Sequence, residues 1–203
     1  MDRATVAFYS ANAPTVAARY EAVVSTLTGH FQAAFRPKSK LLNIGFGSGR
    51  DLAVLLEKGH DCYGVDPANE LVAEAQAYHP ELAGRLAQGS LPELLSPFGG
   101  AFDGILCSAV LMHIPVELLP MAARSISACL RTEGRLLYSV PCKRLDVVSD
   151  DRDSHGRLFV PDPQDQIQYN FQDLGLKLVS SWTDEDSMGR DAVRWKSLLM
   201  EKR

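Results

Sequence analysis

Three glycines and one aspartate carry the strongest chemical signal in this chain. Gly45, Gly47 and Gly49 follow the apolar run Leu41–Ile44, so the backbone turns sharply where no Cβ keeps a ligand away from its N–H groups. Asp66 follows about 20 positions after the first of them, at the tip of the next expected strand. A carboxylate at that place accepts hydrogen bonds from ribose hydroxyls, so the spacing predicts a nucleoside site.

The spacing of the third glycine narrows the class of ligand. A dinucleotide fingerprint reads G-x-G-x-x-G, whereas this chain reads G-x-G-x-G and has Arg50 where the third fingerprint glycine belongs. No Gly-Lys dipeptide followed by Ser or Thr occurs, so the phosphate loop of nucleoside triphosphate enzymes is absent. The pattern disfavours diphosphate and triphosphate ligands. It leaves open another nucleoside-bearing ligand, or a turn that serves only the packing of a helix on a strand.

The elements that must position these residues alternate as in a parallel α/β sheet. Strands are expected at residues 41–45, 62–65, 85–88, 102–108 and 135–140. Helices are expected between them, and a leader helix begins near Asn12 and runs to Gly29. Two last strands, 176–182 and 194–202, follow a helix at 164–174. The sequence therefore predicts an α/β fold with a doubly wound sheet.

Composition and charge limit the class of protein. The chain has 203 residues, of which 46% are hydrophobic, so a sizeable core is expected. A formal net charge of −4 gives no electrostatic footprint for nucleic acid, and no apolar run is long enough to span a membrane. Four scattered cysteines form no metal-binding spacing and favour a reducing cytoplasm. We expect one domain over 1–203, with a helical leader at 1–36 and a lid-like loop at 142–163.

From about Lys40 to Pro141 the chain resembles the class I S-adenosylmethionine-dependent methyltransferases. The resemblance rests on the G-x-G-x-G turn after the first strand and on the acid that ends the second. It implies S-adenosylmethionine as cofactor and a mostly parallel, seven-stranded sheet with helices on both faces and an antiparallel last strand. Asn43 departs from the family, which usually has Asp or Glu two residues before the first glycine. It keeps an acceptor oxygen but lacks the charge that attracts the methionyl ammonium.

The resemblance also implies which residues contact the cofactor. They come from two leader tyrosines, the glycine turn, the ends of the second and fourth strands and the turn after the third: Tyr9, Tyr20, Asn43, Gly45, Phe46, Gly47, Gly49, Arg50, Asp66, Pro67, Gly89, Ser90, Leu91, Ser108, Ala109 and His113. Ser90 stands where the family commonly has an acid that meets the adenine amine, and a plain turn is the alternative. Tyr20 also fits the apolar stripe of the leader helix, so a core position is its alternative.

His113 is the best candidate for a catalytic base, by its residue type and by its place just after the fourth strand. A role in the pocket wall is the alternative, because transfer of a sulfonium methyl is an in-line displacement that positioning alone can promote. Residues 151–162 match part of a calcium loop, but no flanking amphipathic helices are expected, so no metal is predicted.

The sequence as a whole favours a cytoplasmic methyltransferase. Its acceptor is expected to be an unidentified small molecule, with neither nucleic acid nor membrane as a partner, and no oligomeric state is predicted. Two other functions stay open. One is a non-catalytic sensor that binds S-adenosylmethionine or S-adenosylhomocysteine, and the other is a nicotinamide-dependent oxidoreductase.

Overall fold

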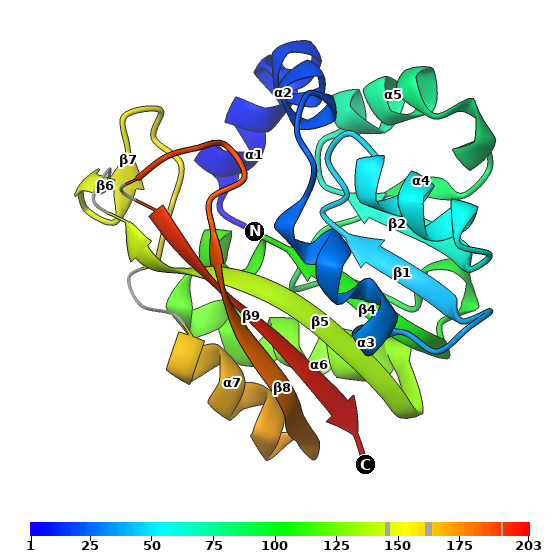
Figure 1. The fold of residues 1–203 in the computed structure, drawn as a ribbon. Coiled ribbons are helices and arrows are strands. Elements are labelled where there is room, and N and C mark those ends of the chain that lie inside the picture. The colour runs from blue at the N-terminus through cyan, green and yellow to red at the C-terminus, as the bar shows by residue number, and fades with distance from the viewer. Residues whose placement is uncertain (145–146, 161–163, 192) are drawn as a thin grey trace.

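A seven-stranded sheet organises the chain, of which the computed structural model describes residues 1–144, 147–160, 164–191 and 193–203 (Figure 1). The strands of this sheet are β1 (Lys40–Ile44), β2 (Asp61–Asp66), β3 (Leu86–Gln88), β4 (Phe102–Ser108), β5 (Leu130–Arg144), β8 (Leu176–Glu185) and β9 (Val193–Lys202). A separate short ribbon pairs β6 (Val147–Ser149) with β7 (Arg152–Asp153).

The strand order is β3-β2-β1-β4-β5-β9-β8. The pairs β1–β2, β1–β4, β2–β3 and β4–β5 are parallel, whereas β9 runs antiparallel to both β5 and β8. The chain winds one way from β1 to β3 and the other way from β4 onward, so the order reverses between β1 and β4. The predicted doubly wound, mostly parallel sheet with an antiparallel last strand is confirmed.

Apolar side chains of the strands supply two cores, one on each face of the sheet. The helices are α1 (Arg3–Ala11), α2 (Ala13–Glu21), α3 (Phe31–Ala34), α4 (Arg50–Glu57), α5 (Asn69–Tyr78), α6 (Leu119–Cys129) and α7 (Gln164–Asp173). In β1, Leu42 and Ile44 join the core of α6 and α7, while Leu41 joins that of α3, α4 and α5. This alternation on two buried faces is typical of parallel strands. Within the described ranges, no helix is both long and apolar enough to cross a membrane.

The leader differs from the predicted single helix over residues 12–29. The helix α2 ends at Glu21, and a 3₁₀ turn begins at Thr26 after Ser25, whose Oγ accepts a hydrogen bond from the Leu27 backbone. Val24 is 77% exposed, so the apolar stripe that suggested a continuous helix is broken there. The helix α1 was not predicted. It begins at Asp2, whose carboxylate caps it by accepting from the Thr5 backbone.

The second difference lies in β5, which is longer than the predicted strand 135–140. Antiparallel pairing with β9 continues from Arg135 to Arg144, beyond the predicted end at residue 140, through a register shift between Pro141 and Lys143. The predicted lid-like loop 142–163 includes residues 145–146 and 161–163, which lie outside the described residues. Its described part contains the β6–β7 ribbon and the segment up to residue 160.

The close packing of β4 on the leader gives a first prediction. A Cβ added at Gly104 would lie 2.6 Å from Phe35 Cδ1 and 2.8 Å from Leu41 Cδ2. Gly104→Ala is therefore expected to lower the free energy of unfolding by about 1–3 kcal/mol, the usual effect of overpacking a core. Gly29→Ala is the matched control, since a Cβ there meets nothing within 4 Å. Urea denaturation that gives both variants the same stability would contradict the described packing.

Candidate functional site

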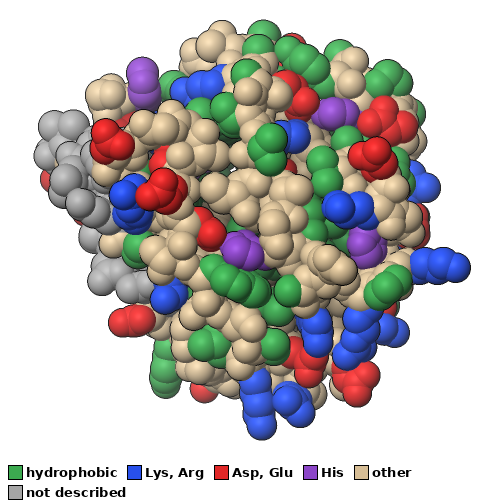
Figure 2. Space-filling model, in the orientation of Figure 1, with side chains coloured by type: hydrophobic (Ala, Val, Ile, Leu, Met, Phe, Trp, Pro, Cys, Tyr) green, Lys and Arg blue, Asp and Glu red, His purple; other side chains and the backbone are tan. Residues whose placement is uncertain are grey.

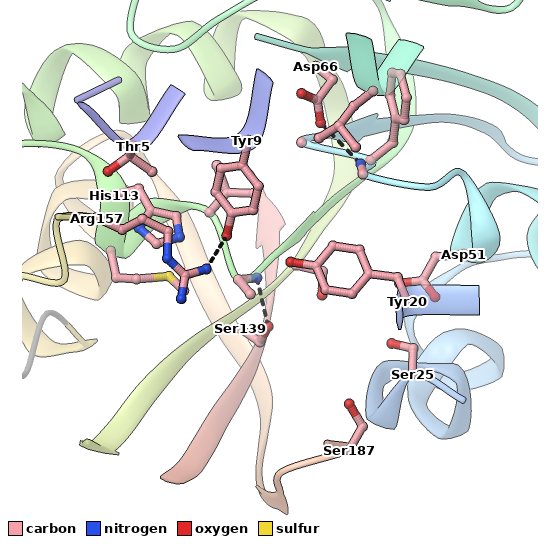
Figure 3. Close-up of a pocket in the computed structure, with 18 of the residues that line it drawn as sticks. Thr5, Tyr9, Tyr20, Ser25, Asp51, Asp66, His113, Ser139, Arg157 and Ser187 are labelled. Atoms are coloured by element: carbon pink, nitrogen blue, oxygen red, sulfur yellow. Dashed lines mark hydrogen bonds between the residues drawn. The ribbon is translucent and has the colours of Figure 1, made fainter. Parts of the chain in front are cut away.

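A pocket opens where the chain reverses its winding, at the carboxyl ends of the central strands (Figure 3). This is the place where doubly wound sheets bind ligands. The structure brings most of the predicted site residues together in its lining: Tyr9, Tyr20, Asn43, Gly45, Phe46, Gly47, Arg50, Asp66, Pro67, Ser108, Ala109 and His113. They come from α1, α2 and the ends of β1, β2 and β4, which are far apart in the sequence.

The glycine turn after β1 requires residues without a side chain. Gly45 and Gly47 have φ angles of 72° and 61°, in the left-handed region that glycine adopts without strain. A Cβ at Gly45 would overlap the Val110 side chain, and one at Gly47 would lie 3.2 Å from the ring of Tyr20. The turn is thus pressed between the end of β4 and the leader, and its backbone faces the pocket.

Asp66 ties this turn to the tip of β2. Its Oδ2 accepts a hydrogen bond from the Gly47 backbone N–H at 3.0 Å, and its Oδ1 accepts one from the Ala68 N–H at 3.0 Å. The side chain is only 4% exposed. Burial raises the pKa of Asp66 to about 6, although the two backbone bonds favour the charged form. A carboxylate with spare lone pairs therefore faces the pocket and changes its charge near pH 6.

Asn43 offers an unused acceptor to the same pocket. The residue is 2% exposed, and among the described residues its Oδ1 has no hydrogen-bond partner. Leaving a buried polar atom unpaired costs about 1–3 kcal/mol. The Asn43 oxygen is therefore available to a donor that enters the pocket.

Arg50 fixes the leader over the pocket. Its Nη1 donates to the backbone oxygens of Tyr20 and Val23 at 2.8 and 2.7 Å, and its Nε donates to Asp51 Oδ1 at 3.1 Å. These bonds hold Tyr20 against Gly47. Burial, with a smaller effect of Tyr9, raises the pKa of the Tyr20 hydroxyl, so it stays neutral. Figure 3 shows the Tyr9 and Tyr20 hydroxyls pointing into the pocket from opposite sides.

His113 lies buried beside Tyr9, with 6.0 Å between the ring centroids. Its Nδ1 is 2.6 Å from the backbone oxygen of Leu158. Because a carbonyl oxygen only accepts hydrogen bonds, Nδ1 carries the proton, and in the neutral ring Nε2 is the basic atom. The ring also packs edge-on against Phe159, at a centroid distance of 4.7 Å. His113 is thus part of the pocket wall, and its ring is held through Nδ1.

The end of β4 forms the floor between these groups. Ala109 has a φ of 56°, which is rare for a residue with a Cβ, and its N–H donates to Ser139 Oγ on β5 at 3.1 Å. Strained backbone held by a specific bond often marks a functional segment. Figure 3 shows this bond below the two tyrosines.

Four predicted cofactor contacts do not line this pocket: Gly49, Gly89, Ser90 and Leu91. A Cβ at Gly49 would face His79 and Leu82, on the side of α5. The Gly89 N–H donates to the backbone oxygen of Asp66 at 3.0 Å, and Ser90 Oγ donates to that of Leu91 at 3.0 Å. Leu91 is buried in the core. A contact of this turn with adenine stays a prediction.

Sequence reasoning missed most of the far wall of the pocket, of which it expected only Arg157, as a charge of the lid-like loop. This wall is formed by two turns, one after β7 and one after β8, together with residues near them: Met112, Arg157, Phe159, Asp186, Ser187, Met188, Arg190 and Trp195. The signal that could have found these turns is a repeated pattern, D-S-x-G-R, at residues 153–157 and 186–190.

The fold and the pocket together define a Rossmann-like domain with a nucleoside site at the switch point of its sheet. Residues 16–192 match a family model described as a methyltransferase domain. The chain belongs to this family, that of the class I S-adenosylmethionine-dependent methyltransferases. The predictions of family and of S-adenosylmethionine as its cofactor are confirmed.

Known proteins are similar to this chain in sequence or in fold. The chain is 34% identical over 110 residues to a protein-L-isoaspartate O-methyltransferase of Methylobacillus flagellatus; the match covers 51% of this chain and 48% of that protein, so it spans about half the relative's length. The crystal structure of the [4+2]-cyclase SpnF has a TM-score of 0.74 at 15% identity, covering 97% of this chain and 94% of that one.

A third similar protein is the 1,6-didemethyltoxoflavin-N1-methyltransferase of Burkholderia thailandensis. Its crystal structure with bound 1,6-didemethyltoxoflavin and S-adenosylhomocysteine has a TM-score of 0.67 at 22% identity, and the match covers 98% of this chain and 87% of that one. At such identities the two solved structures show a shared fold. Because one of them is a cyclase, the acceptor and the reaction must be argued from the site itself.

The raised pKa of Asp66 predicts a pH-dependent affinity for S-adenosylhomocysteine. Only the ionised carboxylate offers all its lone pairs to ribose hydroxyls, so affinity should rise as the pH rises from 5 to 7, with the change centred near the pKa of about 6. Asp66→Asn cannot ionise, so its weaker affinity should stay constant over the same range. Calorimetric titration measures both, and a wild-type affinity that is equal at pH 5 and 7 would contradict the assignment.

Proposed function

We propose that this protein transfers the methyl group of S-adenosylmethionine to a small-molecule acceptor. The observation that carries the proposal is the bond between Asp66 and the Gly47 N–H, because a carboxylate held beside a side-chain-free turn supports a ribose-binding role for Asp66. The unused Asn43 acceptor in the same pocket supports it.

The chemical types of the residues in the pocket match the groups of S-adenosylmethionine. Asp66 would hold the ribose, the backbone of Gly45 and Gly47 would contact the adenosyl and methionyl parts, and Asn43 Oδ1 would accept from the methionyl ammonium. Ser108 and Ala109, at the end of β4, would lie beside the sulfonium. Bound there, S-adenosylmethionine supplies a methyl group that its positive sulfur has already activated.

For methyl transfer, the residues of the protein must position the acceptor and take up any proton that its reacting atom carries. Tyr9 and Tyr20 cover the pocket from the leader and exclude water from it. We propose that His113 Nε2 takes the proton from an acceptor that carries one, while the Leu158 oxygen holds the ring through Nδ1. Holding the nucleophile in line, about 3 Å from the methyl carbon, supplies much of the rate.

A small acceptor, and not a nucleic acid, fits the surface. The formal net charge is −4, and Figure 2 shows Lys and Arg side chains interspersed with Asp and Glu on the face drawn. The four cysteines are free, which supports the proposed reducing cytoplasm. Neither a sensor role nor a nicotinamide-dependent reaction is favoured by any contact described above.

A labelled-methyl assay tests the proposal. The protein is incubated with methyl-labelled S-adenosylmethionine and the protein-free, small-molecule fraction of a cell extract. Label should appear in a small molecule, with release of S-adenosylhomocysteine. Tight binding without turnover would instead indicate a sensor, and stabilisation by a nicotinamide dinucleotide would indicate an oxidoreductase.

Removal of the Asp66 carboxylate should weaken cofactor binding. Hydrogen bonds to a charged group contribute about 1.5–3 kcal/mol, so Asp66→Ala is expected to raise the Kd for S-adenosylhomocysteine about ten- to a hundredfold. Asp61→Ala, at the exposed start of the same strand, is the control and should bind normally. Equal affinities of the two variants would remove the ribose assignment.

His113→Gln separates the two roles of the histidine. The amide side chain keeps polarity but is not basic, so kcat should fall about a hundredfold or more if His113 is the base, with the Kd for S-adenosylhomocysteine unchanged. The kcat is measured at saturating acceptor, once the assay has found one. A fall of less than about threefold would leave His113 with a wall role only.

A further inference from the structure

The two turns of the far wall share the sequence pattern D-S-x-G-R and similar backbone hydrogen bonds, and each contains an Asp–Arg ion pair. Residues 153–157 read Asp-Ser-His-Gly-Arg and residues 186–190 read Asp-Ser-Met-Gly-Arg. The first follows β7, and the second connects β8 to β9. In Figure 1 both approach the end of the sheet where the leader helices lie.

The first turn is built around Asp153. Its Oδ1 accepts from the backbone N–H groups of His155 and Arg157, both at 3.0 Å, while its backbone oxygen accepts from Gly156. Gly156 has a φ of 77°, which closes the turn. The Arg157 guanidinium then donates to Asp153 Oδ2 through Nε at 2.9 Å and Nη2 at 2.6 Å.

The second turn repeats these bonds around Asp186. Its Oδ2 accepts from the backbone N–H groups of Met188 and Arg190, both at 3.1 Å, and its backbone oxygen accepts from Gly189, whose φ is 70°. Arg190 donates through Nε at 2.9 Å and Nη2 at 2.7 Å. Burial opposes the charge of Asp186, but hydrogen bonds from Arg190 and Trp195 lower its pKa to about 2. Both pairs are therefore charged at neutral pH.

Each aspartate fixes the plane of its arginine through the Nε and Nη2 groups. Both arginines line the pocket. Arg157 is 8% exposed, and its Nη1 donates to the Tyr9 hydroxyl at 3.1 Å, so this nitrogen lies on the pocket side (Figure 3). Nη1 carries two N–H groups, and the bond to Tyr9 uses one of them.

The surface between the two turns suits a flat molecule. Met112, Phe159 and Trp195 pack in one buried cluster and line the pocket. Aromatic rings and thioethers make favourable contacts with the faces and edges of planar, conjugated groups. His113, the proposed base, packs against Phe159 in the same wall.

We propose that Arg157 and Arg190 are the specificity-determining pair of the acceptor site and select a planar, conjugated acceptor that bears a carboxylate. This inference rests on the function proposed above. Guanidinium groups held in a fixed plane recognise carboxylates better than a flexible ammonium does. Two such groups, each set by its own aspartate, can receive a carboxylate without rearranging, so little conformational entropy is lost on binding.

The test uses simple probes on protein saturated with S-adenosylhomocysteine. Benzoate is the planar anion, benzamide is its neutral isostere, and benzylamine is the cation of similar size. Their affinities are measured by calorimetry for the wild type, Arg190→Gln and Arg157→Lys. Arg157→Lys keeps a cation beside buried Asp153 and so protects the fold. Arg85→Gln is the control, because Arg85 pairs with Asp61 and does not line the pocket.

Benzoate should bind the wild type more tightly than benzamide or benzylamine, and each pocket variant should weaken it by about tenfold or more, with Arg85→Gln unchanged. Equal or tighter binding of benzamide or benzylamine would overturn the inference, as would an unchanged benzoate Kd in both pocket variants. Normal affinity for S-adenosylhomocysteine in all variants separates these outcomes from failure of the proposed function. A wild type that does not bind S-adenosylhomocysteine would overturn both.

Discussion

The contact on which the site depends is the one between the Asp66 carboxylate and the N–H of Gly47. It joins the tip of β2 to the turn after β1, and through Ala68 it also fixes the approach to α5. Such an arrangement is costly, since a buried acid whose pKa is raised to about 6 is less stable when charged than it would be in water. This buried acid lies at the edge of the sheet where the fold binds its ligand. Groups with strongly shifted pKa values are common at such sites.

The rest of the pocket is assembled around this contact by long-range hydrogen bonds to the leader. Arg50 holds the leader through two backbone oxygens, and Arg152 holds the cap of α1 through a forked pair with Asp2. Leu158 donates to Thr5 Oγ1, which attaches the turn after β7 to the same helix. The cover of the pocket is thus one connected layer, made of the leader and of the segment from Arg152 to Leu158.

Features of the fold and site that follow from neighbouring residues could be predicted from the sequence. Features that depend on contacts between distant residues could not. The glycine turn and Asp66 could be predicted because both follow from spacing within one βαβ unit. The seven-stranded sheet with its antiparallel last strand was implied only by the resemblance to the methyltransferases. The break in the leader could not be predicted, since it depends on Ser25 capping a new turn and on how α2 packs. Arg190 escaped notice because nothing near it in sequence places it at the sheet edge, and Arg157 was expected only as a charge of the lid-like loop. The expected adenine contacts at Gly89 and Ser90 lie outside the pocket lining, and no spacing rule fixes where that turn points.

Because β9 runs antiparallel to its neighbours, one loop of the pocket wall can change in sequence with little effect on the sheet. Because β9 returns antiparallel along β8, the link between them is a tight hairpin loop at the ligand-binding edge, where a parallel strand would have required a long crossover. A hairpin loop tolerates changes of length and composition without shifting the register of the strands that carry it. The proposed acceptor contact at Arg190 and the proposed cofactor contacts of the glycine turn thus lie on different loops. Varying residues 187 and 188, while Asp186, Gly189 and Arg190 are kept, would change the pocket wall and leave the turn closed.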